Sequence, residues 1–200
     1  MKVIGICGSS GSGKGYVCKL LEKYGLFHID TDKLYREKTA RAGSKCLEEL
    51  VENFGNIILD ENGELNKKEL SKIVFEGEGC SQRLFLLNKI THKYILIDTQ
   101  ELIEEQRKKG ARGVLIDAPV LFESGFNRIC DVTLCVVAPS VEKVQRIIKR
   151  DGITMEKAIS RLNAQISDEK LIHLCDMYIY NSNEADLKVQ IDKIINKLIN

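Results

Sequence analysis

Short apolar runs separated by helical patterns set the fold prediction. The runs cover residues 3–7, 27–30, 113–117, 132–137 and 177–180. Strands that are buried on both faces are apolar along their length, and parallel strands need helical crossovers between them. The pattern therefore predicts an α/β protein with a parallel sheet covered by helices on both faces. The first helix presents Val17, Leu20, Leu21 and Tyr24 on one face and is expected to end at Gly25.

The stretch between the second and third runs is much longer than one crossover helix requires. Apolar residues recur there at helical spacing in three segments, residues 47–54, 70–74 and 84–103. We interpret this stretch as a helical subdomain that binds a substrate; the alternative is a helical cap without a ligand. At the end of the chain, residues 187–198 predict a helix that packs on the sheet.

A glycine-rich segment directly follows the first strand and opens the first helix. It reads Gly8-Ser9-Ser10-Gly11-Ser12-Gly13-Lys14. Glycines allow the tight turn, and the helix N-terminus adds a partial positive charge that favours phosphate. Since strand, loop and helix follow in the order of a phosphate-binding loop, we predict that Lys14 bridges the β- and γ-phosphates of a nucleotide.

One position departs from this motif. The residue after the lysine is Gly15, followed by Tyr16, where a Ser or Thr hydroxyl usually ligates Mg²⁺. The backbone cradle and Lys14 are retained, so the sequence predicts nucleotide binding more firmly than phosphoryl transfer.

Composition and charge restrict the class further. The chain has 200 residues, of which 44% are hydrophobic, 30% are charged and only two are proline, as in an ordinary globular domain. Its formal net charge of +1 gives no general attraction to nucleic acids or anionic membranes. We expect a cytoplasmic protein, because no apolar run is long enough for a membrane span or a signal peptide. The seven scattered cysteines are expected to be reduced, and the nearest pair, Cys130 and Cys135, matches no common zinc spacing.

The reaction class follows from two further observations. None of the Asn-Lys pairs is followed by the aspartate of a GTPase base-reading motif, so a GTPase is disfavoured. An ATPase motor is normally larger, whereas 200 residues with a helical insertion suit a small-molecule kinase. Asp30 and Asp32 are two residues apart at the end of the second strand, at the carboxyl edge where α/β proteins bind ligands. One of them is predicted to accept a proton from a substrate hydroxyl, the alternative being a pair of solvated loop acids.

The ordered motifs resemble the dephospho-coenzyme A kinase family over nearly the whole chain. The similar segments are Ile29-Asp30-Thr31-Asp32 with Arg36, Asn53-Phe54-Gly55, residues 58–70, Val74-Phe75, residues 117–123, Gln145-Arg146, Arg150-Asp151-Gly152, residues 161–165, Cys175-Asp176 and Asn181. Each segment is weak alone, but their joint order is specific.

The resemblance implies one P-loop kinase domain over residues 1–200, with three layers and a five-stranded parallel sheet. Residues 1–32 and 111–200 would form the nucleotide-binding core, residues 33–110 a helical acceptor-binding subdomain and residues 140–166 a helical lid. The implied reaction is ATP-dependent phosphorylation of the ribose 3′-hydroxyl of dephospho-coenzyme A, the last step of coenzyme A biosynthesis. ATP and dephospho-coenzyme A would be the substrates, with Mg²⁺ held through the ATP phosphates.

The resemblance also assigns roles to individual residues. The catalytic residues would be Asp32 as base, Lys14 and Arg146. Arg146 and Arg150 are four apart and share a predicted helix face. ATP would contact Gly8, Ser9, Ser10, Gly11, Ser12, Gly13, Lys14, Gly15, Tyr16, Arg146 and Arg150. The acceptor would contact Asp32, Arg36, His92, Asp117, Glu123 and Arg161.

Two departures leave alternatives open. Gly15 allows a nucleotide- or coenzyme-binding paralogue that does not catalyse or is weakly active, and a kinase for another small alcohol is a further possibility. His92-Lys93 stands where the family usually has His-Pro. We expect a monomer or a weak homo-oligomer that binds neither nucleic acid nor membrane.

Overall fold

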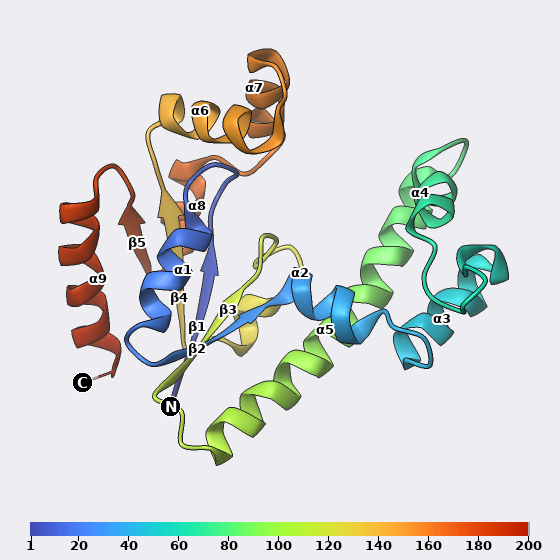
Figure 1. Cartoon of the computed structure of the whole chain (residues 1–200), viewed down its shortest axis with the longest axis horizontal. Coiled ribbons are helices and arrows are strands. Elements are labelled where there is room, and N and C mark those ends of the chain that lie inside the picture. The colour runs from blue at the N-terminus through green and yellow to red at the C-terminus, as the bar shows by residue number, and fades with distance from the viewer. Residues whose placement is uncertain (200) are drawn as a thin grey trace. The chain divides into compact units, whose positions relative to one another are not determined.

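Five parallel strands form one sheet in the order β2-β3-β1-β4-β5 in the computed structural model, which describes residues 1–199 (Figure 1). The central β1 pairs with β3 on one side, where Ile4 is opposite Leu115, and with β4 on the other. All five predicted strands are present, so the predicted α/β fold is confirmed. Their bounds are β1 Lys2–Cys7, β2 Leu26–Asp30, β3 Gly113–Asp117, β4 Val132–Val137 and β5 Met177–Tyr180.

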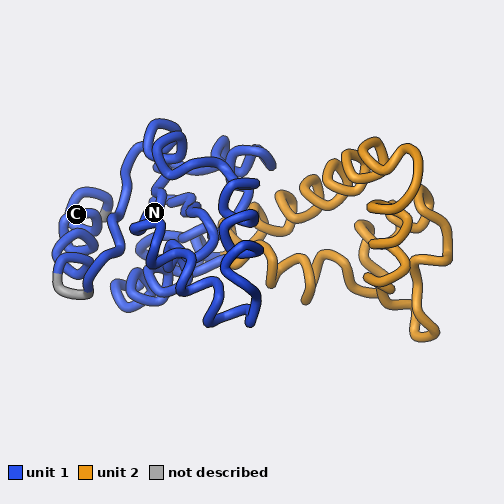
Figure 2. Tube along the Cα trace, turned by 90° about the horizontal axis from the view of Figure 1, so that it is seen from above, with its two compact units in different colours: residues 1–29, 106–200 blue, residues 30–105 orange. Residues whose placement is uncertain are grey.

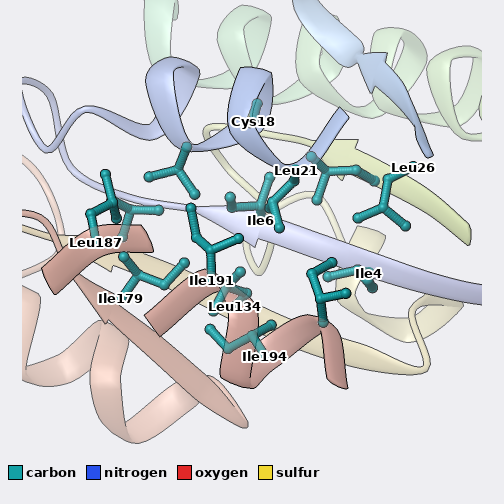
Figure 3. Packing of buried hydrophobic residues seen from close by; sticks show 14 residues of the cluster. Ile4, Ile6, Cys18, Leu21, Leu26, Leu134, Ile179, Leu187, Ile191 and Ile194 are labelled. Carbon is teal, nitrogen blue, oxygen red and sulfur yellow. The ribbon is translucent and has the colours of Figure 1, made fainter. Parts of the chain in front are cut away.

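Helices cover both faces of the sheet. On one face, α1 (Lys14–Glu22) and α9 (Glu184–Ile199) bury their apolar stripes against alternate residues of the strands, among them Ile6, Leu134 and Ile179 (Figure 3). On the opposite face, a Cβ added to Gly5 would lie 2.7 Å from Cys130 Sγ, so the chain beyond β3 packs directly on β1. Burial on both faces explains why the strands lack a polar alternation.

Further short elements connect β3, β4 and β5. They are the 3₁₀ turn Phe126–Ile129 and the helices α6 (Ser140–Asp151), α7 (Met155–Asn163) and α8 (Asp168–Leu174). The Thr154 hydroxyl caps α7 by accepting from the Lys157 backbone N–H at 3.4 Å, as its position before the helix predicts.

The chain divides into two compact units, residues 1–29 with 106–200 and residues 30–105 (Figure 2). The first unit contains the sheet, apart from the last residue of β2. The second is helical and has its own core, in which Leu50, Ile58, Val74 and Ile90 are buried. Its elements are α2 (Thr31–Leu34), a π-helical turn (Tyr35–Thr39), α3 (Lys45–Phe54), the 3₁₀ turn Asn56–Ile58, α4 (Lys67–Phe75) and most of α5 (Cys80–Lys108).

All seven cysteines of the chain lie within the described residues as free thiols, four of them buried. Among residues 1–199, none of the helices has the length and apolar character that crossing a membrane would require.

Candidate active site

The loop between β1 and α1 requires glycine at two positions. Gly11 and Gly13 have φ values of 78° and 85°, in the left-handed region. A Cβ on Gly11 would lie 2.5 Å from the Lys143 carbonyl oxygen, and one on Gly13 would clash with the Asn181 side-chain amide. The loop therefore packs tightly against its neighbours and leads directly into the N-terminus of α1, a position that favours a bound phosphate.

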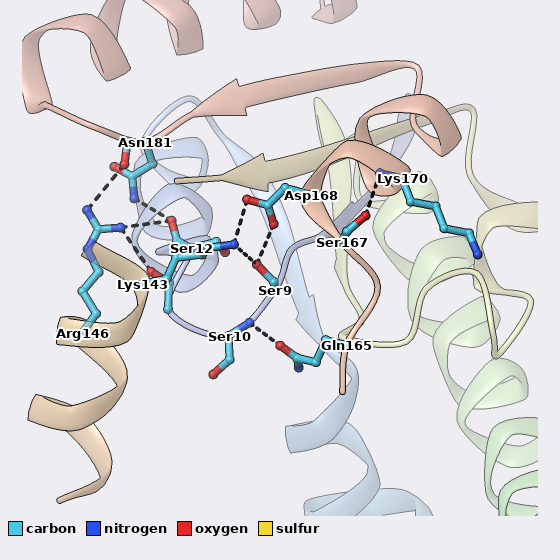
Figure 4. A network of polar contacts seen from close by, with 11 residues as sticks. Ser9, Ser10, Ser12, Lys143, Arg146, Gln165, Ser167, Asp168, Lys170 and Asn181 are labelled. Carbon is cyan, nitrogen blue, oxygen red and sulfur yellow. Dashed lines mark hydrogen bonds and ion pairs between the residues drawn. The ribbon is translucent and has the colours of Figure 1, made fainter. Parts of the chain in front are cut away.

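Two side chains hold the second half of this loop. Arg146, on α6, donates to the carbonyl oxygens of Gly11 at 3.2 Å and Ser12 at 3.4 Å. The side-chain amide of Asn181, which follows β5, donates to the Ser12 carbonyl at 2.8 Å (Figure 4). Arg146 also pairs with Glu142 at 2.6 Å. Arg146 thus lies at the phosphate loop, where in this structure it holds the backbone.

A buried ion pair holds the first half of the phosphate loop. Lys143 has a side chain only 8% exposed and contacts Asp168 at 2.8 Å. Both groups bond the Ser9 hydroxyl, which donates to Asp168 at 2.9 Å and accepts from Lys143 at 3.2 Å (Figure 4). Because a buried charge is costly without a partner, this arrangement fixes Ser9 between α6 and α8.

Ser10 is contacted from α6 and from the segment after α7. Its backbone N–H donates to Gln165 Oε1 at 2.9 Å, and its hydroxyl accepts from Arg150 at 3.1 Å. Arg150 and Arg161 both pair with Asp151. Hydrogen bonds from these two arginines, Arg150 foremost, lower the pKa of Asp151 to about 2. Arg150 therefore lies at the loop, whereas Arg161 ties α7 to the end of α6.

Lys14, the first residue of α1, forms an ion pair with Asp117 Oδ1 at the end of β3. The other carboxylate oxygen, Oδ2, lies 3.6 Å from Cys18 Sγ and 3.5 Å from His28 Nε2. Burial alone raises the pKa of Asp117, but His28 and Lys14 outweigh it, so this pKa is lowered. The sequence-based assignment of Asp117 was to the acceptor, and the structure places it against the phosphate-loop lysine.

Gly15 lies in regular helix, and a Cβ added there would meet none of the described atoms within 4 Å. A serine side chain therefore has room at this position. Tyr16, the next residue, is 43% exposed. In the loop itself, the Ser12 hydroxyl is buried and has no hydrogen-bond partner within residues 1–199.

A pocket of about 230 Å³ adjoins the loop. Its walls come from the end of β1, the segment after β3, the segment between α7 and α8 and one residue of α8, and Glu123 is one of the lining residues. The complete lining is Cys7, Gly8, Ser9, Pro119, Val120, Leu121, Phe122, Glu123, Ala164, Gln165, Ile166 and Leu171.

Comparison with known proteins identifies this site's family. The model of the dephospho-CoA kinase family matches residues 2–186. The chain belongs to the dephospho-CoA kinase family. A dephospho-CoA kinase of Fusobacterium nucleatum is 36% identical over 192 residues, covering 96% of this chain and 95% of that protein. One of Carboxydothermus hydrogenoformans is 31% identical over 186 residues, covering 93% and 88%. The crystal structure of a Thermus thermophilus protein is similar with a TM-score of 0.77 and 30% identity, covering 98% and 96%.

The remaining residues predicted from the dephospho-CoA kinase resemblance belong to the second unit. Asp32 lies in the first turn of α2, where Asp30 caps the helix by accepting from the Lys33 backbone N–H at 2.9 Å. His92 lies in α5 and is partly buried. Arg36 lines a pocket of about 270 Å³ together with Tyr35, Ala40, Arg41, Glu64, Leu65 and Lys67.

Sequence reasoning did not identify Lys143 and Asp168 as residues of this dephospho-CoA kinase site. They contact Ser9 from 134 and 159 residues away, and no local spacing connects them. The one available signal was position: Lys143 precedes Arg146 by one helical turn, so the two share a face of α6.

Proposed function

We propose that this chain transfers the γ-phosphoryl group of ATP to the ribose 3′-hydroxyl of dephospho-CoA, giving ADP and CoA. The family match over residues 2–186 carries this assignment. The phosphate loop supports it, because the loop is preformed and ends in a lysine at a helix N-terminus.

The nucleotide end of the reaction is assigned to residues 8–16. The loop backbone and the N-terminus of α1 bind the phosphates, and Lys14 exchanges the Asp117 carboxylate for the β- and γ-phosphate oxygens. Arg146 and Arg150 already contact the loop at Ser12 and Ser10, which supports their assignment to phosphates within a lid of residues 140–166. This exchange would separate Asp117 from its lysine partner when the nucleotide binds.

Asp117 also fits a magnesium ion, since Mg²⁺ is usually held by one or two carboxylates together with substrate phosphates and water. Gly15 supplies no side-chain oxygen, so Asp117 would be the protein ligand, with water completing the shell. When bound, the ion would neutralise charge on the transferring phosphates.

The acceptor end is assigned to residues 33–110 and to Asp32. Asp32 would orient the 3′-hydroxyl and accept its proton late in the transfer, because a secondary alcohol does not ionise by itself. The pocket beside Arg36 carries two further cations, Arg41 and Lys67, of which Arg41 pairs with Glu64 at 3.2 Å. These charges suit an anionic part of the acceptor. The acceptor roles of His92, Glu123 and Arg161 stay predictions.

The decisive experiment is an ADP-release assay with Mg-ATP, with and without dephospho-CoA, in which mass spectrometry identifies the product. We expect ADP release that depends on the acceptor, and an acceptor heavier by one phosphate. The Lys14→Ala variant is the control and should lose both ATP affinity and rate. ADP release that is independent of acceptor, or no release, would contradict the assignment.

Gly15 favours a second candidate, a paralogue that binds nucleotide or coenzyme without catalysis. Gly15→Ser has room for its hydroxyl and distinguishes the two. A rise in turnover of an already active protein identifies the missing ligand as limiting. If both forms bind ATP and neither produces CoA, the binding paralogue is favoured.

A further inference from the structure

Three potential metal ligands meet beneath the phosphate loop, one from each of three adjacent elements. They are Cys18 on α1, His28 on β2 and Asp117 at the end of β3, and their ligand atoms all lie within 4.8 Å of one another. Asp117 Oδ2 is 3.6 Å from the sulfur and 3.5 Å from the His28 nitrogen. Tetrahedral zinc with bond lengths near 2.0–2.3 Å places its ligands about 3.3–3.8 Å apart. The two measured separations therefore match the edges of such a tetrahedron.

The histidine is held in the orientation that a ligand needs. Its Nδ1 lies 2.7 Å from Glu22 Oε1, and its Nε2 is buried and makes no hydrogen bond to any residue that the structure describes. Metal-bound histidines commonly donate their second N–H to a carboxylate, which fixes the tautomer and directs the lone pair at the ion. Glu22 is placed for this role, and it leaves Nε2 directed at Asp117.

Charge in the cluster also suits a cation. The two carboxylate oxygens of Asp117 have different neighbours: Oδ1 contacts Lys14, and Oδ2 faces Cys18 and His28. An ion on Oδ2 is therefore compatible with the Lys14 contact on Oδ1. Burial and the nearby Asp117 carboxylate raise the pKa of the Cys18 thiol, so binding must displace its proton: the S–H bond breaks, a metal–sulfur bond forms and H⁺ leaves to solvent.

We propose that Cys18, His28 and Asp117 form a binding site for a divalent transition metal ion of the zinc type, with water as fourth ligand. One sulfur, one nitrogen and one oxygen donor suit Zn²⁺ or Co²⁺ and disfavour Mg²⁺, which takes oxygen ligands. The ion would join α1, β2 and β3. Of these elements, α1 begins with Lys14, β2 is followed closely by Asp32, and β3 ends with Asp117.

The test uses Co²⁺ as a spectroscopic probe on the purified whole chain in Mg²⁺-free buffer, because the proposed function also assigns Asp117 to Mg²⁺. We expect one equivalent of Co²⁺ to produce a thiolate-to-cobalt charge-transfer band in the near ultraviolet, and Zn²⁺ to abolish it. Zn²⁺ should also raise the Tm of the wild type. These readouts do not require kinase activity.

Variants assign the ligands. Cys18→Ser and His28→Gln should each abolish the band, and His28→Gln serves if the buried Cys18→Ser variant folds poorly. Cys130→Ser is the matched control: its sulfur donates to the Phe126 carbonyl at 3.2 Å, away from the cluster, so the band should persist. Glu22→Gln should keep the band but weaken metal affinity by about 10–100-fold, as expected for a carboxylate that orients a ligand.

Two outcomes overturn the proposal. One is a wild-type protein that shows no cobalt–thiolate band. The other is a band that persists in folded Cys18→Ser and His28→Gln and is lost on Cys175→Ser, which would place the metal at the thiols near Cys7 instead.

Discussion

The two units place their candidate residues in contrasting surroundings. In the sheet unit, the phosphate loop is enclosed by side chains from α6, α8 and the segment after β5, and Lys143 is almost completely buried. In the helical unit, Asp32 and Arg36 are exposed residues of short helical turns. The nucleotide end is thus fixed before any ligand binds, and the acceptor end presents side chains on a surface.

This contrast suggests different roles for the nucleotide-binding and acceptor-binding residues. A loop fixed by buried contacts supplies phosphate binding with little reorganisation, which is how preorganised electrostatic sites act. Exposed side chains acquire their function when a substrate positions them. Damage to the sheet unit should therefore affect stability and ATP binding together, and damage to the helical unit should affect turnover with the fold intact.

The largest effect is expected from Asp32→Asn. Loss of a general base typically costs about 10²–10⁴-fold in rate, and asparagine keeps the size and one accepting oxygen of the exposed Asp32 side chain. We expect kcat to fall by this factor while ATP affinity and Tm stay unchanged, measured by steady-state kinetics and calorimetry. Glu52→Gln, at an exposed carboxylate on α3 of the same unit, is a control for surface charge. Unchanged kcat in Asp32→Asn would remove this residue from the mechanism.

Gly11→Ala tests the rigidity of the nucleotide end. The new Cβ would sit at φ 78° and 2.5 Å from the Lys143 carbonyl, and strain of this kind costs at least about 2 kcal/mol. We expect that loss in the free energy of unfolding, together with weaker ATP binding.

Gly15→Ala is the matched control for that variant, because its Cβ has open space in a regular helix. It should stabilise the protein by about 0.5–1 kcal/mol. Denaturant unfolding of both variants makes the comparison. Equal stability of the two would contradict the tight packing of the loop.

Asp168→Asn removes the partner of buried Lys143. Breaking a buried pair costs about 3–5 kcal/mol; because Asp168 is itself 22% exposed, we expect about 2 kcal/mol. Glu69→Gln breaks the exposed pair with Lys72 in the helical unit and should cost at most about 0.5 kcal/mol. If chemical denaturation gives similar losses for both, the Ser9 side of the loop is not held by the buried pair.

The sequence predicted the features that depend on neighbouring residues, namely the strands and the phosphate loop. The apolar runs identified every strand, and the phosphate loop was recognisable because strand, glycines and helix are consecutive. The π-helical turn at Tyr35–Thr39 was not predicted, since a single wide turn has no periodic signature. Lys143, Asp168 and His28 were also missed as parts of the site. Their partners are distant in sequence, so only the folded chain brings them together.

The smallest effect is the pH dependence contributed by His28. The Asp117 carboxylate, and then Glu22, raise its pKa above the ordinary value. A group whose pKa is raised in the fold stabilises it fully below the unfolded pKa of about 6.5, and this stability is lost as pH rises through the folded value. With metal removed by chelation, the wild type should thus lose stability relative to His28→Gln as pH increases from about 6 to 9. Unfolding free energies of both proteins at several pH values measure the difference. A difference that does not change with pH would mean that the fold leaves the pKa of His28 at its unfolded value. A wild type that instead gains stability with rising pH would mean that His28 is neutral in the fold, which is the form that a metal ion would bind.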